Sequence, residues 1–253
     1  MLRKSFYLLY SIISYLLFMA TFAYLIGFTG NLFVPRSIDN AIESPFLVAL
    51  LINSILVALF GLSHSVMARQ SFKNWWTKIV PQPIERSTYV LVASLMLALV
   101  MWQWRTIDII IFDVSASPIS IAFWLAFWSG WGLVVLSTFL INHLDFVGLR
   151  QAYLSKQNVP YSQLPFVVRS LYHLVRHPLQ LGVILGIWST PVMTAGHLLL
   201  AITMLIYIFI GLKYEERDLI ATFGDEYREY AAKTPMLIPG VRAKSPEAAK
   251  IIH

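Results

Sequence analysis

The sequence of 253 residues contains no cysteine, and only 13% of its residues are charged. The lack of cysteine excludes disulfides, iron–sulfur clusters, cysteine-ligated zinc and a cysteine nucleophile. Soluble domains carry about 25% charged residues, and disordered chains combine high charge with low hydrophobicity. Because 58% of the residues are hydrophobic and the mean hydropathy is +0.68, both classes are excluded. This composition is typical of a membrane protein.

Long apolar runs dominate the chain. A transmembrane helix needs about 20 mostly apolar residues, and six segments meet or approach this length: 6–28, 46–68, 87–104, 119–142, 179–191 and 195–214. Proline and glycine lie between the last two segments, which predicts a tight helical hairpin within the membrane. Pro178 is expected to begin the fifth helix. We therefore predict an all-α, polytopic transmembrane helical bundle of five to six spans with a cytoplasmic C-terminal tail.

The basic residues are distributed unevenly between the two sides of this topology. The N-terminus, the 69–86 and 145–177 loops and the tail from Lys213 hold all but two of the 19 lysines and arginines, the exceptions being Arg36 and Arg105. The positive-inside rule then places both termini in the cytoplasm, across a plasma membrane or a bacterial inner membrane. Topology accounts for the net charge of +6, so we expect contact with membrane lipid and no binding of nucleic acid.

The C-terminal third carries the most informative motifs. Residues 176–182 read Arg-His-Pro-Leu-Gln-Leu-Gly, residues 215–216 are Glu-Glu, and residues 223–230 read Phe-Gly-Asp-Glu-Tyr-Arg-Glu-Tyr, before a segment at 234–240 with two prolines. This order resembles the isoprenylcysteine carboxyl methyltransferase superfamily of integral-membrane methyltransferases. In that superfamily an Arg-His-Pro motif precedes a helical hairpin, a Glu-Glu pair and two spaced tyrosines. Gln180 departs slightly from the pattern.

Upstream segments narrow the resemblance. Residues 64–69, 75–76, 83–89, 142–151 and 188–198 look like the nurim-like and methanethiol S-methyltransferase branch. The resemblance implies a single membrane methyltransferase domain over 1–253, with a four-helix part at 1–144 and a donor-site part at 145–253. It also implies S-adenosylmethionine as methyl donor and a small thiol, methanethiol, as acceptor, giving dimethyl sulfide. The alternatives are another lipophilic acceptor, such as a prenylcysteine carboxylate, and a non-catalytic nurim-like membrane protein.

The donor would need particular partners. Its methionine carboxylate is matched by an arginine or by backbone amides, and its amino group and ribose hydroxyls by carboxylates. Arg176 and the Glu215–Glu216 pair offer these groups at the two ends of the hairpin, and free backbone amides are expected at 177–178. Without the resemblance, Arg176 would be interpreted as one of the basic residues that flank a cytoplasmic helix end, and the Glu215–Glu216 pair as a solvated helix end. The donor-site residues that the resemblance implies are Arg176, His177, Pro178, Gly182, Glu215, Glu216, Tyr227 and Tyr230.

The acceptor needs activation, because the thiolate is the nucleophile. A histidine near the cytoplasmic end of a helix can act as general base, and a cation can lower the pKa of a thiol. The candidates are His64 and His143, with Arg69, Asp145 and Arg150 close to them in sequence. The alternative is a histidine that is hydrogen-bonded between helices.

Two further features are weaker. His173 and His177 are four residues apart, which suits two metal ligands on one helical face. However, a residue before proline is disfavoured in a helix, and we predict no metal site. Aromatic and basic residues at 145–178 predict an interfacial helix or a lid over the pocket. The oligomeric state cannot be read from the sequence.

Overall fold

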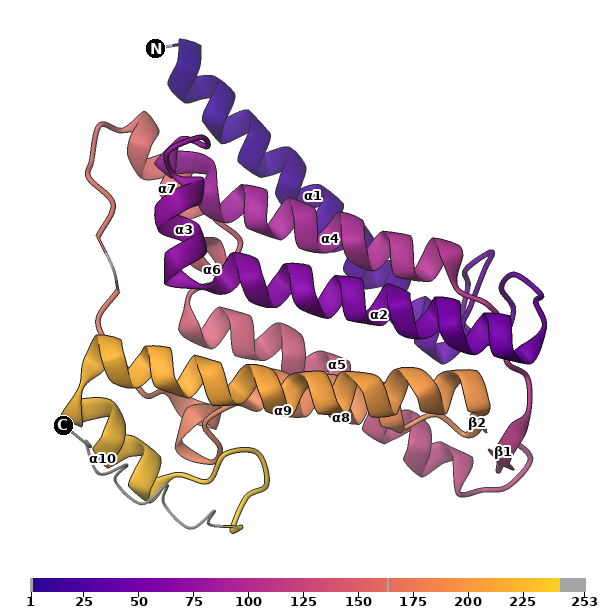
Figure 1. The fold of residues 1–253 in the computed structure, drawn as a ribbon. Coiled ribbons are helices and arrows are strands. Elements are labelled where there is room, and N and C mark those ends of the chain that lie inside the picture. The colour runs from indigo at the N-terminus through magenta and orange to yellow at the C-terminus, as the bar shows by residue number, and fades with distance from the viewer. Residues whose placement is uncertain (1, 163, 242–253) are drawn as a thin grey trace, which may run out of the picture.

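The computed structural model describes residues 2–162 and 164–241, so the tail beyond 241 lies outside the described residues. Five helices in this part are long and apolar enough to cross a membrane. They are α1 (Leu2–Gly30), α2 (Phe46–Ala68), α4 (Glu85–Gln103), α5 (Ser120–Ile141) and α9 (Ala195–Phe223), and they pack into one bundle (Figure 1). The predicted all-α polytopic bundle is confirmed, and the chain is an integral membrane protein.

Short helices gather at one end of the bundle and a small sheet lies at the other (Figure 1). The short helical elements are α3 (Gln70–Trp76), η1 (Gln82–Ile84), α6 (His143–Phe146), α7 (Leu149–Lys156), η2 (Ser170–His173) and α10 (Asp225–Lys233). The start of α1 lies at the same end as α10. The start of the first described helix and the last described helix therefore lie at the same end of the bundle.

The predicted hairpin is partly wrong. Helix α8 (Pro178–Trp188) has 11 residues and rises about 16 Å, which is half of the roughly 30 Å hydrocarbon core of a bilayer. The stretch interpreted as a tight turn contains strand β2 (Val192–Thr194), which pairs antiparallel with β1 (Ile110–Asp113). Hydropathy detects an apolar run, but it cannot detect a backbone partner from a distant part of the chain. Pro178 begins α8 as predicted.

Glycines allow α8 to pack closely on α5. A Cβ atom added to Gly130 would lie 2.4 Å from the backbone nitrogen of Gly186, and one added to Gly182 would lie 2.6 Å from the carbonyl oxygen of Gly130. Small residues of this kind let the backbones of membrane helices approach each other. Helix α8 is therefore fixed against α5, and with it the start of α8 where the Arg-His-Pro motif lies.

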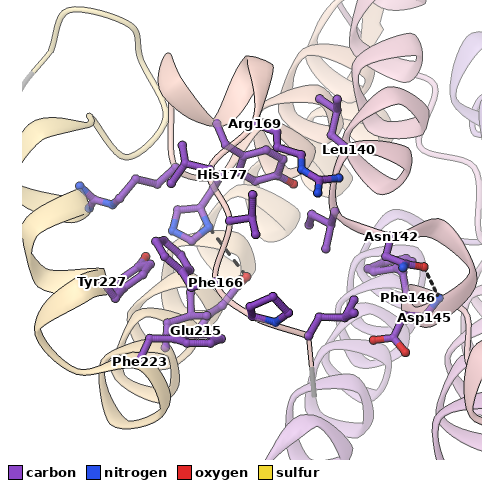
Figure 2. A pocket seen from close by; sticks show the side chains of 18 of the residues that line it. Leu140, Asn142, Asp145, Phe146, Phe166, Arg169, His177, Glu215, Phe223 and Tyr227 are labelled. Carbon is purple, nitrogen blue, oxygen red and sulfur yellow. Dashed lines mark hydrogen bonds and ion pairs between the residues drawn. The ribbon is translucent and has the colours of Figure 1, made fainter. Parts of the chain in front are cut away.

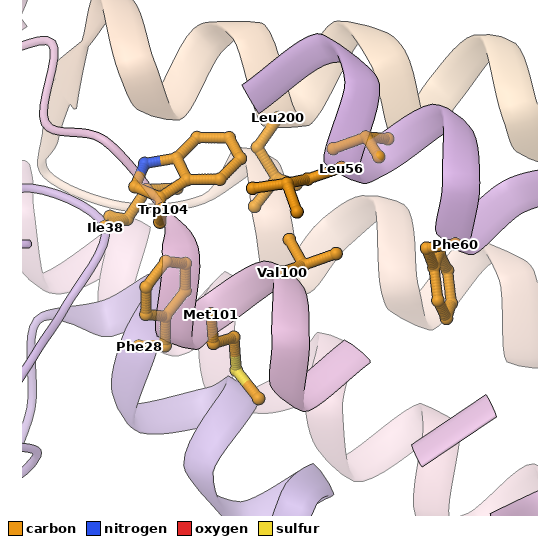
Figure 3. Packing of buried hydrophobic residues seen from close by; sticks show 9 residues of the cluster. Phe28, Ile38, Leu56, Phe60, Val100, Met101, Trp104 and Leu200 are labelled. Atoms are coloured by element: carbon orange, nitrogen blue, oxygen red, sulfur yellow. The ribbon is translucent and has the colours of Figure 1, made fainter. Parts of the chain in front are cut away.

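A hydrophobic core holds α1, α2, α4 and α9 together toward the β1–β2 end (Figure 3). Trp104, which directly follows α4, is fully buried and meets Phe28 of α1 edge to face, with ring centroids 6.1 Å apart. The labelled members of this cluster are Phe28, Ile38, Leu56, Phe60, Val100, Met101, Trp104 and Leu200. This packing joins the four helices at the end of the bundle that carries the sheet.

Candidate active site

A cavity of about 570 Å³ lies at the end of the bundle that carries the short helices (Figure 2). Residues from α3, α4, α5, α6, α7, α9 and α10 line it, together with Tyr161, residues 164–169 and Tyr172. Small-molecule sites range from about 300 to 1,000 Å³, so the volume suits a cofactor-sized ligand. The predicted site residues in its wall are Asp145, Arg176, His177, Glu215, Tyr227 and Tyr230.

Arg176 and Glu216 meet, as the sequence predicts, but they bind each other. The Nη2 and Nε atoms of Arg176 lie 2.6 and 2.7 Å from Oε1 of Glu216, and Nε2 of His177 lies 3.1 Å from the same oxygen. Nη1 of Arg176 donates to the carbonyl oxygens of Ala231 and Thr234, at 2.8 and 2.6 Å. Arg176 therefore joins the start of α8 to α9 and to the end of α10.

The backbone before Pro178 is also occupied. The N–H groups of Arg176 and His177 donate to the carbonyl oxygens of Pro235 and Met236, at 2.9 and 3.1 Å. The expectation of free backbone amides at 177–178 is wrong, because the segment after α10 pairs with this stretch and Pro178 has no N–H. This pairing makes the 235–236 segment part of the support for the cavity.

Other polar groups of the motif remain available. Oε2 of Glu215 accepts from Nε2 of Gln180 at 3.0 Å, and Oε1 of Glu215 lies 3.9 Å from Nδ1 of His177 (Figure 2). The hydroxyl of Tyr227 is buried and has no hydrogen-bond partner in the described part of the chain. The Tyr230 hydroxyl donates to the carbonyl of Tyr172 at 2.6 Å. Burial raises the pKa of Tyr227, and raises that of Tyr230 to about 12, so both hydroxyls are protonated at neutral pH.

Tyr161 and residues 164–169 form one wall of the cavity. Helices α6 and α7 precede it, and the described residues between α7 and η2 (157–162 and 164–169) have no regular secondary structure. The ring of Phe166 lies 5.3 Å from Phe223, 5.8 Å from Tyr227 and 5.4 Å from Tyr230, between centroids. Arg169 reaches across the cavity toward the end of α5 (Figure 2). The predicted interfacial helix is therefore limited to the start of the 145–178 region.

Neither predicted catalytic histidine is among the residues that line the cavity. Nδ1 of His64 lies 2.7 Å from the hydroxyl of Tyr207, and its Nε2 lies 2.8 Å from the hydroxyl of Tyr89. His143 lies 2.9 Å from Thr138 Oγ1 through Nδ1 and 3.1 Å from the Tyr15 hydroxyl through Nε2. Both rings are thus hydrogen-bonded between helices, which was the alternative to a catalytic role. Their role as general base stays a prediction.

The remaining predicted residues have structural partners. Arg69 pairs with Asp218 at 3.1 Å, and Arg150 pairs with Asp145 at 3.2 Å. Gly182 packs against α5. Within residues 2–162 and 164–241, no group of three or more histidine, aspartate and glutamate side chains is placed to hold a metal ion.

Sequence reasoning missed four charged residues that line the cavity: Lys73, Glu85, Arg86 and Arg169. Glu85 is 8% exposed, and none of the four takes part in an ion pair between described residues. Charges beside an apolar run are first interpreted as topology signals. The position of Glu85 and Arg86 within the 83–89 motif is a signal in the sequence that could have identified these two as candidate site residues.

Comparisons with known proteins agree with this architecture. The chain is 50% identical over 232 residues to a methanethiol S-methyltransferase of Mycobacterium tuberculosis, covering 92% of this chain and 95% of that protein. It is 46% identical over 244 residues to one from Crocosphaera subtropica, covering 96% of both chains. A nurim homolog of Drosophila pseudoobscura pseudoobscura is 25% identical over 222 residues, covering 79% of this chain and 87% of that protein. No family model and no solved structure matches. At this identity and coverage, the chain belongs to the methanethiol S-methyltransferase family.

Proposed function

We propose that the protein transfers a methyl group from S-adenosylmethionine to methanethiol, which yields dimethyl sulfide. The observation that carries the proposal is the cavity of about 570 Å³ in which the Arg-His-Pro, Glu-Glu and Tyr-x-x-Tyr motifs converge. Relatives at 50% and 46% identity are named for this activity. Small thiols are the acceptor class that those names specify.

Several polar groups in the cavity wall fit the donor. Tyr227 offers a buried hydroxyl with no partner in the described chain, and Glu215 offers a carboxylate for an amino group or ribose hydroxyls. Arg169, rather than the ion-paired Arg176, has a guanidinium available for the methionine carboxylate. The rings of Phe166 and Phe223 add an apolar wall for the adenine. Arg176, His177 and Glu216 then act as positioning residues that fix this end of the cavity.

The donor supplies an electrophilic methyl group on a sulfonium. The protein's contribution is to hold the two reactants in line, since orientation supplies much of the rate in such displacements. Aromatic rings around the cavity exclude water and favour a cationic sulfonium near their faces. The cavity wall therefore supplies orientation and electrostatics, and no residue forms a covalent bond with the methyl group.

We further propose that the cavity faces the cytoplasm and that both termini lie on that side. The support is the concentration of basic residues at the same end of the bundle as the cavity. A charged, water-soluble donor then enters from the cytosol.

The test uses the full chain purified in detergent or in lipid nanodiscs. Methyl-labelled donor with methanethiol should give labelled dimethyl sulfide in the headspace, and calorimetry should detect donor binding. A failure of both measurements would reject the enzyme assignment. Donor binding with methylation of a prenylated cysteine but not of methanethiol would select the other acceptor class. The matched pair Glu215→Gln and Glu226→Gln, the second on the outside of α10, should separate donor affinity from general surface charge.

A further inference from the structure

A set of charged side chains lines the cavity at the start of α4, away from the Arg-His-Pro motif. Glu85 and Arg86 begin α4, and Lys73 extends from α3. The wall beside them is apolar, with Leu140 and Ile141 at the end of α5 and Phe146 at the end of α6. A cation next to a small apolar wall is the environment that suits a short alkyl thiolate.

Arg86 is held in a fixed position there. Its Nε donates to the carbonyl oxygen of Phe146 at 3.0 Å. The guanidinium carbon lies 5.0 Å from the ring centroid of Tyr89 and 5.5 Å from that of Phe146. Its backbone N–H donates to Oε1 of Gln151 on α7 at 3.3 Å. The contacts with Phe146 and Tyr89 orient the guanidinium, and the contact with Gln151 holds the backbone of Arg86. Within the described residues, its two terminal nitrogens make no hydrogen bond or ion pair.

We propose that the guanidinium of Arg86 binds the sulfur of the acceptor as a thiolate, with the methyl group of the acceptor against Phe146 and Leu140. This inference rests on the proposed function and names the acceptor subsite within it. Arg86 would then be a catalytic residue that touches the reacting atom.

The chemistry balances without a protein base. The thiol S–H bond breaks and its proton passes to water. The sulfur lone pair then forms a bond to the methyl carbon, while the C–S bond of the sulfonium breaks and its electron pair stays on the donor sulfur. One anionic and one cationic sulfur become two neutral thioethers. A fixed guanidinium favours the thiolate before the step, and it needs no proton transfer from His64 or His143.

Several other titratable groups face Arg86. They are His64 of α2, Lys73 of α3, Glu85 and Tyr89 of α4, and Tyr161. Burial and the charge of Arg86 lower the pKa of Lys73, although Glu85 and Asp218 oppose that shift. Arginine stays protonated at every physiological pH. Arg86 is therefore the cation at this end of the cavity whose charge does not vary with pH.

The test is a pH–rate profile with two thiols of different acidity. An adjacent cation lowers the pKa of an acid by about 1–3 units, and the nucleophilicity of a thiolate falls with its pKa with a Brønsted coefficient of about 0.4–0.5. At neutral pH, Arg86→Gln should therefore slow methylation of methanethiol by about 3- to 60-fold. The loss should shrink for 2,2,2-trifluoroethanethiol, which ionises more readily, and for methanethiol at alkaline pH.

Three further measurements keep the test decisive. Arg86→Lys should recover most of the rate at neutral pH, because it restores the charge. Arg228→Gln, which removes an exposed arginine of α10, should leave the profile unchanged. In protein saturated with S-adenosylhomocysteine, ultraviolet absorbance of bound ethanethiolate should appear at lower pH in the wild type than in Arg86→Gln.

The outcomes separate the two claims. If the wild type makes no dimethyl sulfide, the proposed function fails. If the wild type is active but Arg86→Gln keeps its pH profile, or loses the same factor with both thiols at every pH, the thiolate assignment is overturned. Unchanged affinity for S-adenosylhomocysteine shows that the Arg86→Gln protein is folded.

Discussion

The contact between α5 and α8 can be tested with two glycines of the same helix. In Gly130→Ala, the added Cβ would lie 2.4 Å from the nitrogen of Gly186 and 2.8 Å from the carbonyl oxygen of Gly182. Both neighbours are backbone atoms, so α8 must move, and overpacking of this kind costs about 1–3 kcal/mol. In Gly132→Ala, the added Cβ meets no atom within 4 Å. Replacing a helical glycine with alanine there contributes about 0.5–1 kcal/mol of stability.

The two variants should therefore differ by at least about 1.5 kcal/mol in the free energy of unfolding. With a shift of about 2–4 °C per kcal/mol for a chain of this size, Gly130→Ala should melt at least about 3 °C below Gly132→Ala. Thermal unfolding in one detergent measures this difference. Because α8 begins at the Arg-His-Pro motif, calorimetry should also show weaker binding of S-adenosylhomocysteine to Gly130→Ala. Equal melting temperatures would refute the close approach of the two backbones.

Four other changes probe the cavity. Glu216→Gln leaves the buried charge of Arg176 without its partner, so thermal unfolding should show a loss of about 3–5 kcal/mol; a variant as stable as wild type would contradict the ion pair. Tyr227→Phe should leave the stability of the unliganded protein unchanged and weaken S-adenosylhomocysteine binding about 2- to 10-fold by calorimetry, and equal affinity would remove Tyr227 from the donor site. Arg169→Gln should weaken S-adenosylhomocysteine binding about 10- to 100-fold, whereas the control Arg228→Gln should not change it. An unchanged affinity in Arg169→Gln would contradict the role of Arg169 in the donor site. Burial lowers the pKa of His143, so the unfolded chain binds a proton at this residue more readily than the folded protein does. The free energy of unfolding should therefore fall as the pH drops below about 6.5. In melting curves measured at several pH values, His143→Gln should lessen that fall.

The membrane helices could be predicted because lipid imposes a simple rule on composition. The run at 46–68 coincides with α2, and that at 119–142 matches α5 within one residue at each end. Helix α9 was predicted to end at 214 but continues to Phe223, since a helix that leaves the membrane loses its apolar signal without losing its backbone hydrogen bonds. Strands β1 and β2 could not be predicted, because each is short and its partner is distant in sequence.

Six of the predicted site residues line the cavity, and their roles stay predictions. The motifs placed Arg176 and Glu216 at one pocket, and the 2.6 Å ion pair confirms that they meet. The sequence does not reveal whether two opposite charges bind a ligand or each other, because this depends on small differences in the direction in which each side chain points. For the same reason Arg86 and Arg169 are interpreted from the sequence as topology charges, although both line the cavity and neither forms an ion pair within the described residues.

The pairing of residues 176–177 with 235–236 has a consequence for how the protein is made. The bundle of α1, α2, α4 and α5 can enter the membrane while the ribosome is still translating. The end of the cavity at the Arg-His-Pro motif, however, lacks its support until Met236 has left the ribosomal exit tunnel. A nascent chain therefore lacks a complete cavity wall, and the cavity becomes complete only when synthesis of this segment is finished. A chain terminated after α9 would retain its apolar helices and insert, yet it would be inactive.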